Sequence, residues 1–285
     1  MNVYVSVDME GCAGIVHREQ TDPKGFDYEL GRRAMAEEAN AAIAGAFDAG
    51  AVRVVVADGH GGNGMRNLRL HDLDPRAEVV TGSPRRLGQL EGIDGGFDAL
   101  LLVGYHTRHG RAGVLSHTTN GQAVGDLWVN GSVVGEVGLN ALLAGSFGVP
   151  TALVTGDDLT CAEAARDAPG CETVTVKWAL GRYAARCLAP SVAGAAVRRG
   201  AAAGVARAAT LTPVALPAAA GAAPVEIRLR FKETGSAESA ARMLGAGLVD
   251  DDTVAFASAT LAEAYAAYSL AVEAWQPAWG AWIRG

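Results

Sequence analysis

Short apolar runs recur through the first half of the chain and constrain its fold more than any other feature. They read VYVSV at residues 3–7, VRVVVA at 52–57, ALLLV at 99–103 and TALVT at 151–155. The second and third are continuous apolar runs, which are typical of sheet strands covered on both faces. Because segments with helical spacing separate these runs, the pattern predicts an α/β fold with a mostly parallel central sheet flanked by helices.

The segments between these strands carry turn and helix signals. Residues 26–50 have helical apolar spacing and end at Gly50, as expected for a long helix with a glycine stop. Asn130-Gly131 lies between two apolar stretches and predicts a two-residue hairpin turn. We expect this hairpin, over residues 126–134, to be a local antiparallel addition to the sheet, with a helix after it over 134–148.

The second half of the chain is less regular. Its patterns predict a helix over 191–209, a strand over 224–231, a helix over 236–245, a strand over 252–258 and a closing helix over 260–275. We therefore expect an α/β domain over residues 1–190 and a smaller C-terminal α+β lobe over residues 191–285, either separate or integrated with the first.

Composition indicates which partners and which cellular compartment to expect. The chain has 285 residues, 49% of them hydrophobic, with a formal net charge of -7. This charge argues against nucleic acid as a partner, because binding to phosphate backbones needs a basic face. The four cysteines form no CxxC pair, and neither an export signal nor a membrane-length apolar run is evident. We expect a cytoplasmic protein with no membrane partner.

Residues that can bind a metal follow three of the predicted strands. Asp8 and Glu10 end the first strand, His60 follows the second and His106 follows the third. Side chains at i and i+2 of a strand share a face, which places both carboxylates on one side. In an open α/β sheet, ligands gather beyond the carboxyl ends of the strands, so the four side chains are expected to meet there.

Two carboxylates and two imidazoles suit zinc or another first-row divalent ion, although each residue alone also fits a helix cap, a solvated loop or a hydrogen-bonded histidine. Like charges clustered in this way would be costly without a cation. Glu136 is a further candidate ligand, or else an acid favourably placed in a first helical turn. His117, in a polar loop, is either a proton shuttle or an exposed histidine.

Three other features carry less weight. Cys12 lies two residues beyond Glu10, and we interpret it as a small buried side chain rather than a ligand. Asp157 and Asp158 end the fourth strand, where they either line a pocket or cap the next helix. The glycine-rich GHGGNGMRN lacks the spacing of a phosphate loop or a dinucleotide site.

Six motifs occur in one order: SVDMEG, DGHG with MRN after it, GYH, SHT, GEVGLNA and VTGDD. Together they resemble the DppA-type zinc-dependent D-aminopeptidase family over about residues 1–190. Several spaced motifs in one order are far more specific than any single motif.

The resemblance implies a site with two zinc ions per subunit in a catalytic domain formed by residues 1–190. The implied metal ligands are Asp8, Glu10, His60, His106 and Glu136. Five side chains fill two tetrahedral shells only if a carboxylate and a water or hydroxide bridge the ions, and we expect Asp8 to bridge. His117 matches a histidine with a catalytic role, whereas the substrate-binding residues stay unassigned. The family also implies a ring-based homodecamer that admits only small peptides.

The sequence therefore predicts a metallo-aminopeptidase that hydrolyses short peptides or amides with an N-terminal D-amino acid. One alternative is a dinuclear metal hydrolase of the same fold that acts on L-peptides, other amides or phosphoesters, because ligands alone do not fix the bond cleaved. Another is a non-catalytic binding protein in which the cluster is structural.

Overall fold

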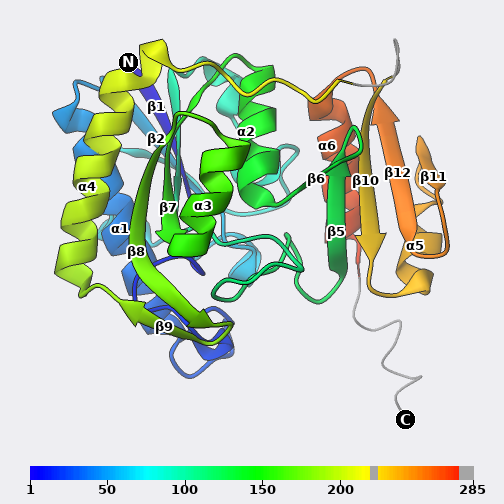
Figure 1. The fold of residues 1–285 in the computed structure, drawn as a ribbon, viewed down its shortest axis with the longest axis horizontal. Coiled ribbons are helices and arrows are strands. Elements are labelled where there is room, and N and C mark those ends of the chain that lie inside the picture. Colours follow the sequence, from blue (N-terminus) through cyan, green and yellow to red (C-terminus); the bar gives the residue numbers. More distant parts are fainter. Residues whose placement is uncertain (219–223, 276–285) are drawn as a thin grey trace.

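A computed structural model describes residues 1–218 and 224–275. Two sheets organise it, and they lie on opposite sides of the molecule in Figure 1. The larger sheet contains β1 (Asn2–Val7), β2 (Arg53–Asp58), β3 (Glu78–Val80), β4 (Ala99–Val103), β7 (Thr151–Asp157), β8 (Glu172–Gly181) and β9 (Ala184–Cys187).

The strands of this larger sheet have the order β3-β2-β1-β4-β7-β8-β9. All neighbours from β3 to β8 are parallel, and only β9 runs antiparallel to its neighbour β8. The predicted α/β fold with a mostly parallel central sheet is therefore confirmed. The strand β1 lies between β2 and β4, which places the carboxyl ends of these three strands side by side.

Helices cover both faces of the parallel sheet. The helices α1 (Tyr28–Asp48) and α4 (Pro190–Arg207) share an apolar core with the β1 face that carries Val3, Val5 and Val7. The helices α2 (Glu136–Ser146) and α3 (Asp158–Asp167) contribute to the core on the opposite face, which carries Tyr4. Strand alternation explains this division, because successive side chains point to opposite faces.

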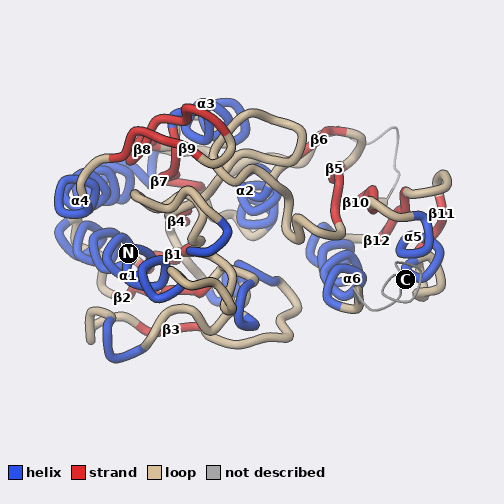
Figure 2. Tube along the Cα trace, turned by 90° about the horizontal axis from the view of Figure 1, so that it is seen from below, coloured by secondary structure: helices blue, strands red, loops and turns tan. Residues whose placement is uncertain are grey.

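The smaller sheet is antiparallel, with the order β11-β12-β10-β5-β6. Its strands are β5 (Val124–Val129), β6 (Ser132–Val134), β10 (Val225–Phe231), β11 (Ala246–Leu248) and β12 (Thr253–Ser258), with α5 (Thr234–Ala240) and α6 (Leu261–Glu273) beside them. In both views of the fold α6 lies between this sheet and α2, and it contacts both (Figures 1 and 2). Short 3-10 turns complete the described chain at Arg18–Gln20, Gly62–Gly64, Leu70–Asp72, Gly88–Leu90, Ile93–Gly95 and Ala208–Thr210.

The Asn130-Gly131 hairpin forms as predicted but belongs to a different sheet. Both turn residues have positive φ, 47° and 79°, as a two-residue hairpin turn requires. The expectation that it adds to the parallel sheet is wrong, because β5 pairs with β10 of the second sheet. The buried face of β5 packs in one core with β10 and α6, and this burial determines its partner.

The two sheets share chain segments from both sides of residue 190. The β5–β6 hairpin precedes that residue and lies in the second sheet, whereas α4 follows it and packs on α1. A domain boundary near residue 190 stays a prediction. Of the described helices, none is long and apolar enough to cross a membrane.

Candidate active site

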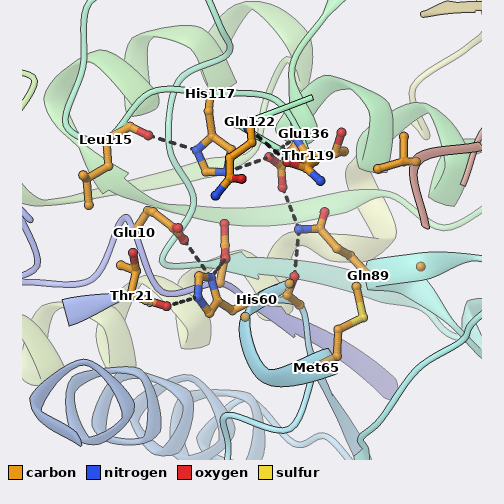
Figure 3. A pocket seen from close by; sticks show the side chains of 18 of the residues that line it. Glu10, Thr21, His60, Met65, Gln89, Leu115, His117, Thr119, Gln122 and Glu136 are labelled. Carbon is orange, nitrogen blue, oxygen red and sulfur yellow. Dashed lines mark hydrogen bonds and ion pairs between the residues drawn. The ribbon is translucent and has the colours of Figure 1, made fainter. Parts of the chain in front are cut away.

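The carboxyl ends of β1, β2 and β4 bring together the side chains that their sequence positions suggested. Asp8, Glu10, His60 and His106 are each at most 7% exposed. Glu136, the first residue of α2, joins them from the opposite side and is 3% exposed. Figure 3 shows Glu10 and His60 on one wall of a pocket, with His117 and Glu136 on the other.

Asp8, Glu10 and His60 form the first of two ligand-type groups, with ligand atoms within 4.8 Å of one another. His60 Nδ1 lies 3.0 Å from Glu10 Oε2 and 3.4 Å from Asp8 Oδ1. The turn that carries His60 is fixed by Asn67, whose amide donates to the His60 carbonyl at 2.7 Å and to Asp58 at 2.8 Å. Asn67 belongs to the MRN motif, so this motif supports the position of His60.

The second group consists of His106, His117 and Glu136. His106 Nε2 lies 3.2 Å from Glu136 Oε1 and 3.3 Å from Asp8 Oδ2. The two oxygens of Asp8 therefore face different histidines, Oδ1 towards His60 and Oδ2 towards His106. A carboxylate placed in this way connects the two groups.

Hydrogen bonds to backbone carbonyls define which imidazole nitrogen faces the carboxylates. His60 Nε2 lies 2.8 Å from the Thr21 carbonyl, and His106 Nδ1 lies 3.0 Å from the Thr107 carbonyl. A carbonyl only accepts, so each of these nitrogens carries the proton. In the neutral ring the other nitrogen then directs a lone pair at the carboxylates, the arrangement of a metal-binding histidine held by an outer hydrogen bond.

The donor atoms fit a divalent cation. Glu10 Oε2 and His106 Nε2 are buried and lack a hydrogen-bond partner among the described residues, a costly state that a bound ion relieves. Burial alone would lower the pKa of His60 and His106, yet the surrounding carboxylates raise both well above the usual value. The cluster thus attracts positive charge, and its carboxylate and imidazole atoms suit zinc.

A buried polar network supports Glu136. Its Oε1 accepts from the Thr119 amide and its Oε2 from Gln89 Nε2, both at 2.7 Å. Asn140 Nδ2 in turn donates to Gln89 Oε1 at 2.6 Å and to the Tyr105 hydroxyl at 3.1 Å. Burial opposes ionisation of Glu136, but the nearby His106 more than offsets it and lowers the pKa. Sequence reasoning missed this network; only Asn140, one helical turn after Glu136, carried a positional signal.

His117 lies against the second group with one nitrogen directed inwards. Its ring stacks on His106, with centroids 4.1 Å apart and planes inclined by 13°. Its Nδ1 lies 2.9 Å from the Leu115 carbonyl, and its Nε2 lies 4.0 Å from Glu136 Oε1. Burial and then the neighbouring His106 lower the pKa of His117, so the ring is neutral near pH 7 with a lone pair on Nε2.

The loop around His117 is strained on both sides. Leu115 and Thr119 have positive φ angles of 54° and 49°, a region that residues with a side chain rarely occupy. Strain of this kind clusters at functional sites, where the surrounding contacts maintain it. Thr119 also supplies the amide that holds Glu136, so the strained loop positions both residues.

A pocket of about 790 Å³ opens above the cluster. Its outer walls include Arg18, Asp22, Arg182, Tyr265 and Tyr268, which sequence reasoning did not assign to the site. The two tyrosines belong to α6, so the layer that packs on the second sheet forms part of the wall.

Asp157 and Cys12 have structural roles. Asp157 Oδ1 accepts from the Thr160 amide at 2.7 Å and caps α3, the capping role that was one of its two expected functions. Cys12 is buried, its thiol donates to the Asp8 carbonyl at 3.3 Å, and burial raises its pKa. Neither ligand-type group of the described chain includes it.

Gly104 allows β4 to pass close to Asp8, and replacing it with alanine is expected to destabilise the protein. Its φ is +71°, and a Cβ there would lie 2.3 Å from the Asp8 carbonyl oxygen. Left-handed backbone costs alanine about 1–2 kcal/mol, and the clash adds to that. Unfolding by urea measures the loss. Gly148→Ala is the control, because Gly148 has φ +77° with nothing within 4 Å of the added atom. Equal losses in the two variants would contradict a close packing role for Gly104.

The fold and the buried cluster are those of an α/β metallohydrolase. Comparison with known proteins agrees: the profile of peptidase family M55, the D-aminopeptidases, matches residues 1–270. The chain is 36% identical to a D-aminopeptidase of Bacillus subtilis (strain 168) over 283 residues, which cover 96% of this chain and 97% of that protein. The chain therefore belongs to the D-aminopeptidase family.

A solved structure is similar over nearly its whole length. It is the Zn-dependent D-aminopeptidase DppA from Bacillus subtilis, described as a self-compartmentalizing protease. The TM-score is 0.89 at 34% identity, and the match covers 96% of this chain and 97% of the other. The predicted family and the enzyme class, an aminopeptidase of the metallopeptidase type, are confirmed.

Proposed function

We propose that the protein is a zinc-dependent aminopeptidase that releases an N-terminal D-amino acid from short peptides or amides, with two zinc ions per subunit. The observation that carries the proposal is the position of Asp8, whose two oxygens face two separate ligand-type groups. One ion would be held by Asp8, Glu10 and His60, and the other by Asp8, His106 and Glu136. Zinc in these positions supplies Lewis acidity towards the scissile carbonyl and lowers the pKa of water.

His117 is the group that we propose to move protons. Its inward Nε2 is unprotonated in the neutral ring, and the Leu115 carbonyl fixes the ring orientation. The same nitrogen can accept a proton from the attacking water and return it to the leaving amine. A proton-transfer group beside the proposed metal site also argues against the alternative of a non-catalytic protein with a structural cluster.

The substrate class follows from the pocket and the relatives. The pocket has the size of a small-ligand site, which suits short peptides. The preference for a D-residue is proposed from the name D-aminopeptidase, which the Bacillus subtilis match carries in both the sequence and the structure comparison. From the self-compartmentalizing relative we propose a homo-oligomer, a decamer by family resemblance. We propose a cytoplasmic location from the four cysteines, which form no CxxC pair.

Purified protein loaded with zinc is expected to release D-alanine from D-Ala-D-Ala or D-Ala-amide. A chelator should stop the reaction and added zinc should restore it, because the proposed reaction depends on the bound ions and every proposed ligand is a side chain of the protein itself. His60→Ala is expected to abolish the activity, since it removes one of only three proposed ligands of the first ion. Product release and elemental analysis on the same samples provide the measurement.

The matched control for this experiment is His71→Ala, which removes an exposed histidine outside the cluster; its side chain is 76% exposed. This variant should retain activity. Cleavage of L-dipeptides only would refute the stereochemical proposal and favour the alternative hydrolase of the same fold. Absence of a divalent ion in protein purified without chelator would refute the metal proposal.

A further inference from the structure

Lys177 of β8 is a buried ammonium that holds the loop after β1. Its side chain is fully buried, and its Nζ donates to the carbonyls of Glu10 at 2.5 Å, Cys12 at 3.0 Å and Ile15 at 2.6 Å. An ammonium has three N–H donors, so all of them are used on this one loop. The contacts join residues more than 160 positions apart in sequence.

The position of this ammonium is costly by itself. Burial lowers the pKa of Lys177, although Asp157 and Glu38 act in the opposite direction, and in the described part of the chain no carboxylate forms a direct ion pair with it. Removing a charge from water without a counter-charge is unfavourable unless polar groups surround it. Three carbonyl oxygens provide that environment, as they would for a bound cation.

The loop has a second buried anchor on a different element. Glu38 of α1 is 3% exposed, and its Oε1 accepts from the Ala13 amide at 2.7 Å. Tight packing limits the loop as well, because a Cβ on Gly11 would lie 1.9 Å from the Tyr105 carbonyl oxygen. The backbone of residues 10–15 is thus held from β8, from α1 and from the end of β4.

Glu10 depends on this backbone for its position. Its Oε2 is buried without a hydrogen-bond partner among the described residues, and His60 Nδ1 lies 3.0 Å from it. No neighbouring donor therefore orients that oxygen, so the placement of the main chain determines where the carboxylate lies. The contact between Lys177 and the Glu10 carbonyl fixes that main chain at the residue itself.

We propose that Lys177 is a positioning residue that, together with Glu38, fixes the loop of residues 10–15 so that Glu10 is presented to the metal. This inference rests on the proposed function, in which Glu10 is a ligand of the first ion. Lys177 touches neither substrate nor metal in this role. Its effect is transmitted through the Glu10 backbone.

The test measures the zinc affinity of three variants by competition with a chromophoric chelator. Lys177→Met keeps most of the side-chain stem and removes every donor, and it is expected to weaken zinc binding about 10–100-fold, as loss of an outer-shell partner does. Lys177→Gln keeps two donors and should give an intermediate loss. Val176→Ala is the control, because it truncates a fully buried neighbour on the other face of β8 and should leave zinc affinity unchanged.

Urea unfolding of the metal-free proteins and the absorption spectra of the cobalt-substituted proteins complete the experiment. A changed cobalt spectrum is expected for Lys177→Met but not for Val176→Ala. Zinc affinities of both Lys177 variants equal to that of Val176→Ala would overturn the inference, even if their stabilities fall. If Lys177→Met does not fold, the comparison of Lys177→Gln with Val176→Ala decides. A wild-type protein that binds no metal would instead overturn the proposed function, and this inference with it.

Discussion

Replacement of Asp8 by asparagine is expected to lower kcat/KM by about a thousandfold or more, a loss of several kcal/mol of transition-state stabilisation by metal. The two oxygens of Asp8 lie 3.4 Å from His60 Nδ1 and 3.3 Å from His106 Nε2. An asparagine keeps the shape but offers one neutral oxygen, so it cannot serve both groups. Kinetics on a D-alanyl dipeptide and zinc analysis of the same protein measure the effect.

Asp98→Asn is the matched control for Asp8→Asn. Asp98 also contacts β1, accepting from the Asn2 amide at 2.6 Å, but at the opposite end of the strand. The same chemical change there should leave zinc content and activity intact. Full zinc content with near-normal activity in Asp8→Asn would contradict a shared carboxylate.

Replacement of His117 by alanine is expected to lower kcat/KM by about 10²–10⁴-fold, the usual contribution of a general acid–base group. Zinc content should stay at the wild-type level, because the proposed ligands His106 and Glu136 keep their hydrogen bonds to Thr107 and Gln89. His117→Ala should therefore keep its zinc but lose turnover, and this combination distinguishes it from Asp8→Asn.

A different result for His117→Ala would assign His117 a different role. His117 lies within ligand distance of His106 and Glu136, so it could itself bind the second ion. Loss of zinc together with activity would assign it as a ligand and refute the proton-transfer role.

Much of the parallel sheet was predictable because four of its strands are short apolar runs separated by segments with helical spacing. The strands β1, β2, β4 and β7 were predicted on that basis, and the positions of Asp8, His60 and His106 beyond their ends followed from sheet geometry. The strand β8 was not predicted, because its buried and exposed residues follow no regular pattern. The strands β3 and β11 have only three residues each, too few for a periodic signal.

The sheet to which the hairpin belongs could not be predicted from the residues of the hairpin alone. The turn sequence determines that β5 and β6 pair, but the partner β10 lies about a hundred residues later and is selected by core packing. The supporting residues of the site have the same limitation. Gln89 and Lys177 are polar residues buried by contacts between distant segments, so periodicity does not distinguish them, whereas Asn140 is marked only by its position one helical turn after Glu136. The sequence also has three tryptophans near its C-terminus, Trp275, Trp279 and Trp282, which suit either an intersubunit or interlobe contact or packing within the chain; Trp279 and Trp282 lie outside the described residues.

Because α6 forms part of the pocket wall, substrate fit and metal binding depend on different elements of the fold. The candidate ligands and His117 belong to the parallel sheet, the loops that follow its strands and the start of α2, whereas Tyr265 and Tyr268 reach the pocket from a helix packed on the other sheet. Substitutions along α6 can therefore alter which peptides fit, and none of them replaces a candidate ligand. The same hydrolytic reaction could in this way be applied to peptides with different side chains. The residues of the proposed metal site would stay the same, and the α6 wall of the pocket would vary.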